Sequence, residues 1–250
     1  MGLLQYRDNT YSQNGEDGVL AEIITRLGLR DGAPRWCVEF GAWDGVHLSN
    51  TFLLVEQHGW NAVYIEGDPA KYRDLLETVE KQPAIVPVQA MVGRHTWDES
   101  SLDKLLKRTP LPHDYDLLSV DIDSYDLDVW EGHTEYRPKI VCIEINSSIP
   151  PGGLHRHNSA RAGNSFSSTI AVGIDKGYTA VCHTGNIIFV DNSLVARLDL
   201  PAGELDNPDA MFLGDWLGTD SDRKATALRA VADKLPPSVQ SYLRRVKSWL

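Results

Sequence analysis

The order of short apolar runs and amphipathic segments along this chain constrains its fold more than any other feature. The apolar runs predict buried strands at 36–40, 62–65, 85–88, 117–120 and 140–145. Periodicity and capping residues predict helices between them at 50–57, 68–81, 101–107 and 167–176. Strands that alternate with helices form a mostly parallel sheet with helices packed on its faces. The pattern therefore predicts an α/β fold.

Three further features refine this sheet. Pro87 lies inside the third strand, and because proline cannot donate to a strand ladder, we expect that strand at a sheet edge. Two β-rich runs at 178–182 and 187–190, joined by a short loop, predict a terminal hairpin. A stripe of apolar residues between Val19 and Leu27 predicts an amphipathic helix ahead of the first strand.

The segment from Trp36 to Gly45 places an acid and two glycines where the first strand breaks into a turn. Glu39, Gly41 and Gly45 follow a Glu-x-Gly-x-x-x-Gly spacing. Glycines at such a turn let the backbone approach a ligand closely. The Gly-x-Gly-x-x-Gly pattern of dinucleotide binders is absent, and Glu39 would repel a pyrophosphate. A cationic or hydroxyl-rich cofactor fits this turn better.

Two polar residues at the ends of the next strands are candidate cofactor contacts. Glu66 ends the second strand, where an acid can accept hydrogen bonds from a ribose hydroxyl pair. Gln89 follows the third strand and could meet an adenine edge by the same geometry. The alternative for Glu66 is a solvated loop acid.

Acidic residues also follow the fourth and fifth strands. Asp121 and Asp123 come after 117–120, and Glu144 and Asn146 end the run 140–145. Because ligands bind outside the carboxyl ends of strands, these side chains should share one crevice and need a counterion. Carboxylate and amide oxygens suit Mg²⁺ or another divalent cation. The alternative is that acids of this run, Asp126 among them, cap the following helix.

Composition limits the partners and the location of the protein. A formal net charge of −11 argues against a nucleic-acid substrate, since such binding depends on Lys and Arg neutralising phosphates. The chain has no apolar run of about 18 residues and no basic, apolar leader, so we expect no membrane span and a cytoplasmic location. Its three cysteines lie in apolar stretches and are expected to be reduced and buried.

The length favours one domain over the whole chain, 1–250. Within it we expect an N-terminal helical segment at 1–35, a cofactor-binding core at 36–191 and a C-terminal helical extension at 192–250. We expect the last helices to pack on the outside or at a subunit contact, which would make the protein a homo-oligomer.

Several motifs, taken as a set, resemble a known family. The turn resembles motif I of class I S-adenosylmethionine (AdoMet)-dependent methyltransferases. Together with the motifs at 11–18, 64–69, 121–123 and 144–146, it is similar to the FkbM-like and macrocin-type sugar O-methyltransferases over about residues 11–191. The same motifs suggest a closer relative, a saccharide O-methyltransferase of the methylmannose polysaccharide pathway.

The resemblance implies a Rossmann-like, seven-stranded sheet of order 3-2-1-4-5-7-6, AdoMet as methyl donor, often Mg²⁺, and a sugar-containing acceptor. The chain departs from the macrocin type in lacking a consecutive Asp-Asp pair. The residues expected to bind AdoMet are Gln13, Glu39, Gly41, Gly45, Glu66, Gln89 and Asp121. The residues expected to bind the metal are Asp121, Asp123, Glu144 and Asn146.

Transfer of a methyl group to a hydroxyl also needs a base near neutral pH. His155 and His157 follow a Pro-Pro-Gly-Gly loop after the fifth strand, and with Asp123 they are the catalytic candidates, His155 being the preferred base. We therefore expect an AdoMet-dependent O-methyltransferase acting on a sugar or oligosaccharide hydroxyl. The alternatives are a methyltransferase for a small phenolic or natural-product acceptor and a non-catalytic relative that binds AdoMet or a glycan.

Overall fold

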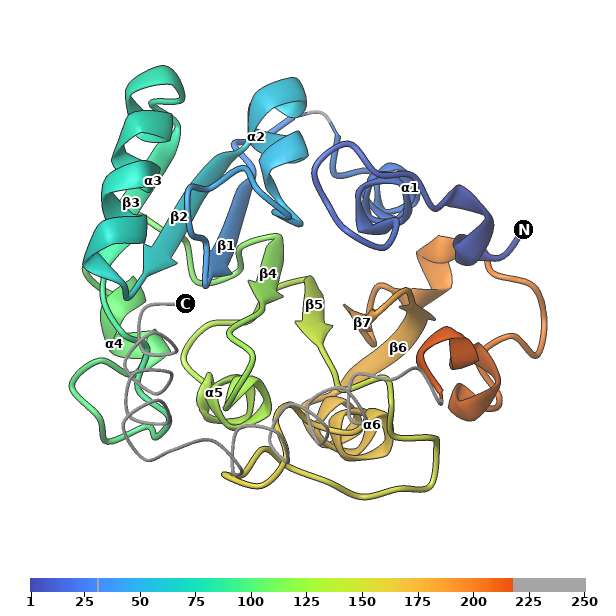
Figure 1. Cartoon of the computed structure of the whole chain (residues 1–250). Helices are drawn as coiled ribbons and strands as arrows, with labels where there is room; N and C mark the ends of the chain where they lie inside the picture. The colour runs from blue at the N-terminus through green and yellow to red at the C-terminus, as the bar shows by residue number, and fades with distance from the viewer. Residues whose placement is uncertain (31, 218–250) are drawn as a thin grey trace. The chain divides into compact units, whose positions relative to one another are not determined.

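The computed structural model describes residues 1–30 and 32–217, and Figure 1 shows how their helices and strands are arranged. The strands are β1 (Trp36–Phe40), β2 (Asn61–Glu66), β3 (Ile85–Gln89), β4 (Leu117–Val120), β5 (Ile140–Glu144), β6 (Tyr178–His183) and β7 (Asn186–Asp191). The α-helices are α1 (Glu16–Leu27), α2 (Phe52–His58), α3 (Pro69–Lys81), α4 (Leu102–Leu106), α5 (Asp126–Gly132) and α6 (Phe166–Asp175). Apart from α5, for which no bounds were predicted, these elements lie close to the predicted bounds.

The strands form one seven-stranded sheet in the order β3-β2-β1-β4-β5-β7-β6. Neighbours from β3 to β5 are parallel, whereas β7 runs antiparallel to both β5 and β6. This order confirms the predicted fold class, a Rossmann-like sheet with the topology of class I methyltransferases. The carboxyl ends of β1, β2, β4 and β5 consequently meet at one edge of the sheet.

Both ends of the sheet follow from local sequence. β3 is an edge strand, with Pro87 opposite Tyr64 of β2, so the missing N–H of proline removes no ladder bond on the open side. The predicted hairpin forms β6 and β7, and its turn contains Gly185 at φ 146°. Antiparallel pairing therefore closes the sheet at its other end.

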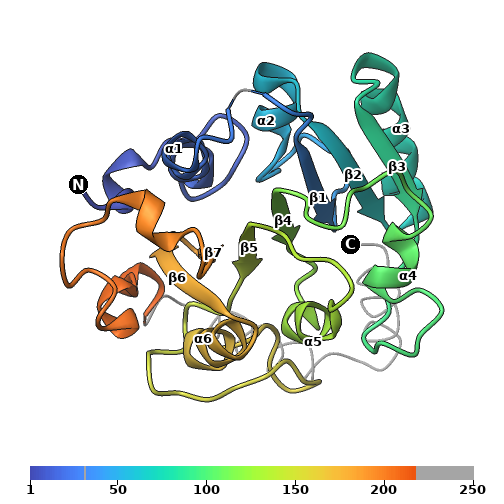
Figure 2. The same ribbon diagram turned by 180° about the vertical axis from the view of Figure 1, so that it is seen from behind.

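Helices cover both faces of the sheet, as Figure 1 and the reverse view in Figure 2 show. Apolar residues of α1, α2 and α3 pack with one set of strand side chains, which includes Cys37 of β1. Residues of α4, α5 and α6 pack with the opposite set, which includes the next residue, Val38. The alternation of side chains along each buried strand divides the core into these two layers. All three cysteines are free and buried.

The described chain divides into two compact units, Met1–Leu213 and a second that begins at Gly214. Short 3-10 helices lie at Leu3–Tyr6, Val195–Leu198, Pro208–Met211 and Gly214–Trp216. The helices expected beyond residue 217, and the subunit contact expected of them, lie outside the described residues. Among the described helices, none has the length and apolar character needed to cross a bilayer.

Candidate active site

A cleft of about 710 Å³ lies at the carboxyl ends of β1, β2 and β4. This volume falls within the range of small-molecule and cofactor sites. Its charged lining residues are Glu39, Glu66, Lys71, Arg94, Asp121 and Asp123. The acids outnumber the cations, so the cleft favours a ligand with positive charge.

The turn after β1 forms one wall of this cleft. Gly41 lines it with a φ of 81°, and an ideal Cβ at this position would lie 2.0 Å from the carbonyl oxygen of Asp121. Gly45, at φ 77°, is instead pressed against the side chains of Leu75 and Tyr64 and is not among the residues that line the cleft. Gly41 therefore serves the cleft surface, and Gly45 serves the packing behind it.

Glu39 is buried beneath the turn and lines the base of the cleft. Its carboxylate accepts hydrogen bonds from the hydroxyl groups of Ser49, at 2.8 Å, and Thr51. Burial raises the pKa of Glu39 despite these bonds. This acid holds the turn and the start of α2 together at the floor of the site.

Glu66 ends β2 and faces the same cleft. One carboxylate oxygen accepts the backbone N–H of Trp43 at 2.8 Å, and the other accepts that of Asp68 at 2.7 Å. Each oxygen keeps a second lone pair, so the carboxylate can still accept hydrogen bonds from a ligand. Glu66, which was predicted to accept hydrogen bonds from a ribose hydroxyl pair, therefore lies in the cleft.

Strained backbone is concentrated around this cleft. Among described residues, four non-glycine residues have positive φ: Trp43, Leu48, Asp123 and Asp199. The first three line the cleft. Such conformations cost about 1–3 kcal/mol each and cluster at functional sites, where the surrounding structure enforces them.

Three acids from the ends of β4 and β5 come together beside the cleft. Asp121, Asp123 and Glu144 each offer a carboxylate oxygen, and these atoms lie within 4.8 Å of one another. Burial, with the charges of Asp126 and Asp123, raises the pKa of Asp121 to about 7. Burial and the charge of Asp121 raise the pKa of Glu144 to about 9. The three carboxylates form a cluster of oxygen donors with negative charge, which fits a hard divalent cation.

Asp126 has a structural role, but it is not the helix cap of the alternative prediction, because α5 has no side-chain cap hydrogen bond. Its buried carboxylate accepts the backbone N–H groups of Ile122, at 2.7 Å, and Ser124, at 2.8 Å. The two bonds hold the loop after β4 in the shape that brings Asp121 and Asp123 together. α5 begins at Asp126 itself.

Asn146 belongs to the loop after β5. Its carboxamide nitrogen donates to the carbonyl of Ala162 at 2.9 Å. Its carboxamide oxygen accepts from the backbone N–H and the hydroxyl of Ser148, at 3.1 and 2.6 Å. These bonds occupy both lone pairs of that oxygen, which leaves none for a cation.

The structure separates the two histidines of that loop. The imidazole of His157 contacts the Tyr125 ring edge-on, with centroids 4.6 Å apart, and Tyr125 lines the cleft. The imidazole of His155 pairs with the carbonyl of Arg161 at 3.2 Å, and His155 lines a separate cavity beside α6. Asn164 holds the backbone of His157 in place. Its side chain accepts the backbone N–H of His157 and donates to the carbonyl of Ser124.

Besides Gly45, two further expected cofactor contacts lie away from the cleft surface. Gln13 is exposed and is not among the lining residues. Gln89 is exposed in a neighbouring groove between β3 and α4, whereas Ala90 and Met91 line the cleft. Gln89 was expected in the cleft. Side chains alternate between the two faces of a strand, and Gln89 therefore points into the neighbouring groove.

Sequence reasoning did not identify Arg94 and Tyr125. Both line the cleft, and the guanidinium carbon of Arg94 lies 4.3 Å from the centre of the Tyr125 ring. They belong to different loops, after β3 and after β4. No local motif marks either residue, so no short-range signal could have paired them.

Comparison with known proteins finds no matching family model and no matching curated protein. Several solved structures are similar at low identity. The complex of M. capricolum TrmK with S-adenosylhomocysteine has 10% identity, a TM-score of 0.46 and coverage of 89% of this chain and 90% of that one. The N-terminal domain of human METTL16 has 12% identity, a TM-score of 0.45 and coverage of 70% and 69%.

The N-terminal domain of EvdMO1 with S-adenosylhomocysteine bound has 12% identity, a TM-score of 0.43 and coverage of 72% of this chain and 80% of that one. At these identities and TM-scores, none of the matches identifies the activity or the substrate of this chain.

Proposed function

We propose that the protein is an AdoMet-dependent O-methyltransferase that methylates a hydroxyl of a sugar or oligosaccharide. One observation carries the proposal: Gly41, Glu66 and Asp121, from the ends of three neighbouring strands, line a single cleft. In a sheet of this order, that crevice is where a nucleoside-like ligand binds. The remaining residues of the cleft supply the functions that such a transfer needs.

Glu66 and Gly41 form the proposed cofactor end. Glu66 would accept hydrogen bonds from the ribose hydroxyls, and its two backbone bonds to Trp43 and Asp68 fix its orientation. Gly41 lets the ligand approach the bare backbone. The excess of acids in the lining favours a sulfonium, which carries a positive charge. AdoMet bound there would supply an electrophilic methyl group.

Asp121, Asp123 and Glu144 would hold a divalent cation such as Mg²⁺. Their clustered oxygens and the raised pKa values of Asp121 and Glu144 support this role, since a bound cation would offset the mutual repulsion and burial that raise them. A cation bound there would lower the pKa of the acceptor hydroxyl. Asn146 is excluded from this proposed ligand set, because its carboxamide is engaged within its loop.

His157 is the proposed general base, with Asp123 as the second candidate. His157 lies against Tyr125 at the cleft, and its Nδ1 accepts the backbone N–H of Gly163 at 3.2 Å, so it could take a proton from an acceptor held beside the carboxylates only after that hydrogen bond breaks. Asp123 is exposed at the same place and bears a strained backbone. His155 faces another cavity and is not included in the proposed mechanism.

Isothermal titration with AdoMet, with and without Mg²⁺, tests the central proposal. Binding is expected in both conditions, and no binding in either would refute it. A panel of oligosaccharide and phenolic acceptors, assayed for methyl transfer with and without EDTA, then tests the acceptor class and the metal. Transfer to phenols alone would contradict the sugar acceptor, and EDTA-resistant transfer would contradict the role of the cation.

A further inference from the structure

We propose that Arg94 selects an acceptor that carries an oxyanion, either a carboxylate or a phosphate, next to the sugar that is methylated. This inference rests on the proposed function of the cleft, because it names the class of acceptor. It depends on how the guanidinium group of Arg94 is held and on which of its donors stay free.

Two contacts hold the guanidinium of Arg94. Its Nε donates to a carboxylate oxygen of Asp128 at 2.9 Å. Its central carbon lies over the Tyr125 ring, 4.3 Å from the ring centre. Together the two contacts restrict the position of the guanidinium group. An arginine held in this way loses little conformational entropy when it binds a ligand.

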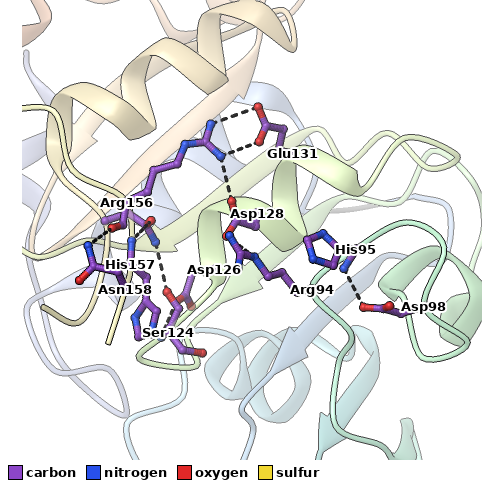
Figure 3. Close-up of polar contacts among 11 residues, drawn as sticks. Arg94, His95, Asp98, Ser124, Asp126, Asp128, Glu131, Arg156, His157 and Asn158 are labelled. Carbon is purple, nitrogen blue, oxygen red and sulfur yellow. Dashed lines mark hydrogen bonds and ion pairs between the residues drawn. The ribbon is translucent and has the colours of Figure 1, made fainter. Parts of the chain in front are cut away.

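The terminal nitrogens of Arg94 form no hydrogen bond or ion pair with any residue in the described ranges, 1–30 and 32–217. Arg156 provides the contrast, because its terminal nitrogens bind Asp128 at 2.9 Å and both oxygens of Glu131, at 2.6 and 3.1 Å. Figure 3 shows both guanidinium groups directed toward Asp128. Arg156 is paired with Glu131, whereas the two terminal nitrogens of Arg94 remain available as a planar pair of hydrogen-bond donors.

That pair of donors matches the geometry of a carboxylate or phosphate, which arginine binds through two parallel hydrogen bonds. The position of Arg94 also fits an acceptor contact. It lines the cleft together with Asp123, Ser124 and Tyr125 of the loop after β4. The other lysine or arginine in the lining, Lys71, instead lies over the Trp43 ring at 4.6 Å, near Glu66.

Arg94→Gln, Arg94→Lys and the control Arg73→Gln, at an exposed residue of α3, test the proposal in the full chain. The probes are a neutral methyl hexoside, the corresponding hexuronide and the corresponding hexose phosphate. Equilibrium binding is measured by calorimetry, and KM and kcat are measured for methyl transfer.

We expect Arg94→Gln to weaken the preferred anionic probe at least tenfold, in Kd and KM, with kcat and the neutral probe unchanged. Arg94→Lys should restore part of this affinity, and Arg73→Gln should match the wild type. The hexuronide and phosphate arms identify which oxyanion is recognised.

Equal losses for neutral and anionic probes would overturn the proposal. The proposal would also be overturned if Arg94→Gln lost affinity for S-adenosylhomocysteine but not for 5′-methylthioadenosine. The terminal nitrogens of Arg94 would then bind the carboxylate of the cofactor. Wild-type protein that binds no AdoMet would refute the methyltransferase proposal, while the calorimetric comparison of the sugar probes would still decide the role of Arg94.

Discussion

An ideal Cβ on Gly41 would lie 2.0 Å from the carbonyl oxygen of Asp121. The turn after β1 and the end of β4 therefore touch through bare backbone. Gly41 forms the cofactor end of the proposed site, and Asp121 belongs to the carboxylate cluster. Any side chain at position 41 would push these two parts of the cleft apart.

Gly41→Ala should both destabilise the protein and abolish AdoMet binding. The left-handed φ of 81° costs a side chain about 1–2 kcal/mol, and the backbone overlap adds about 1–3 kcal/mol. Denaturant unfolding and calorimetry measure the two effects. Gly59→Ala is the control, since Gly59 also has positive φ, 66°, but an added Cβ would have nothing within 4 Å. Equal effects of both changes on AdoMet binding would contradict this role of Gly41.

Glu66→Gln should weaken AdoMet binding by about 10- to 100-fold, because a charged acceptor is replaced by an amide whose NH₂ group faces one of the two backbone N–H donors. Trp43 and Asp68 supply those donors. Calorimetric Kd values provide the measurement. Glu77→Gln, on an exposed face of α3, should leave Kd unchanged. Unaltered affinity in Glu66→Gln would exclude the ribose contact.

Glu144→Gln should remove the response to Mg²⁺ while leaving the metal-free protein nearly as stable as the wild type. With a pKa of about 9, Glu144 already carries a proton at pH 7, and glutamine resembles that form. Saturating Mg²⁺ should raise the unfolding free energy of the wild type by about 3 kcal/mol at 100 times its Kd. Thermal unfolding with and without Mg²⁺ measures this difference.

Glu80→Gln, at an exposed position of α3, serves as the control for the metal experiment and should keep the full Mg²⁺ response. A wild type that ignores Mg²⁺, or a Glu144→Gln variant that responds like the wild type, would exclude the cluster as a cation site.

His157→Ala should lower kcat by about 100-fold, within the range of general-base catalysis. His155→Ala is the matched control from the same loop and should leave kcat near the wild-type value, because His155 faces another cavity. The reverse pattern would assign the base to His155.

Protonation of His183 should destabilise the protein in mild acid. Its Nδ1 accepts the backbone N–H of Leu213 at 2.9 Å, and its Nε2 pairs with the Ser147 hydroxyl at 3.1 Å, so the buried ring is neutral. Burial and then the charge of Arg7 lower the pKa of His183 to about 4. The unfolded chain, with a histidine pKa near 6.5, binds the proton first as the pH falls.

The contribution of the neutral His183 ring to the free energy of unfolding is therefore complete above about pH 6.5. It is lost as the pH falls toward 4. It amounts to roughly 3 kcal/mol at about 1.4 kcal/mol per pKa unit. Urea unfolding at several pH values should show this slope, and His183→Gln should flatten it. A slope that is unchanged in the variant would rule out His183 as its source.

The fold could be predicted because its signals are local. The second strand was expected at 62–65 and lies at Asn61–Glu66, and Pro87 alone indicated the edge strand. Apolar runs, proline and the hairpin loop each act over a few residues. The strand order followed from resemblance to a family, since periodicity does not specify which strands are neighbours.

The candidate site could be predicted only where a residue ends a strand or directly follows it. Asp121 and Glu144 come together for that reason, and Glu66 reaches the cleft. Gln89 shows the limit, because a shift of one residue at a strand end turns the side chain to another face. Asn146 shows a second limit, since its hydrogen bonds within the loop cannot be read from its type.

The alternation of strands and helices, the strained turn at Gly41 and the acids at the strand ends depend on neighbours along the chain and can be read from it. The approach of His157 rather than His155 to the cleft, and the position of Arg94 over Tyr125, instead depend on the folded structure. Those relationships join loops that are distant in sequence. Their geometry depends on long-range contacts, such as those of Asn164 and Asp128, which no local pattern encodes.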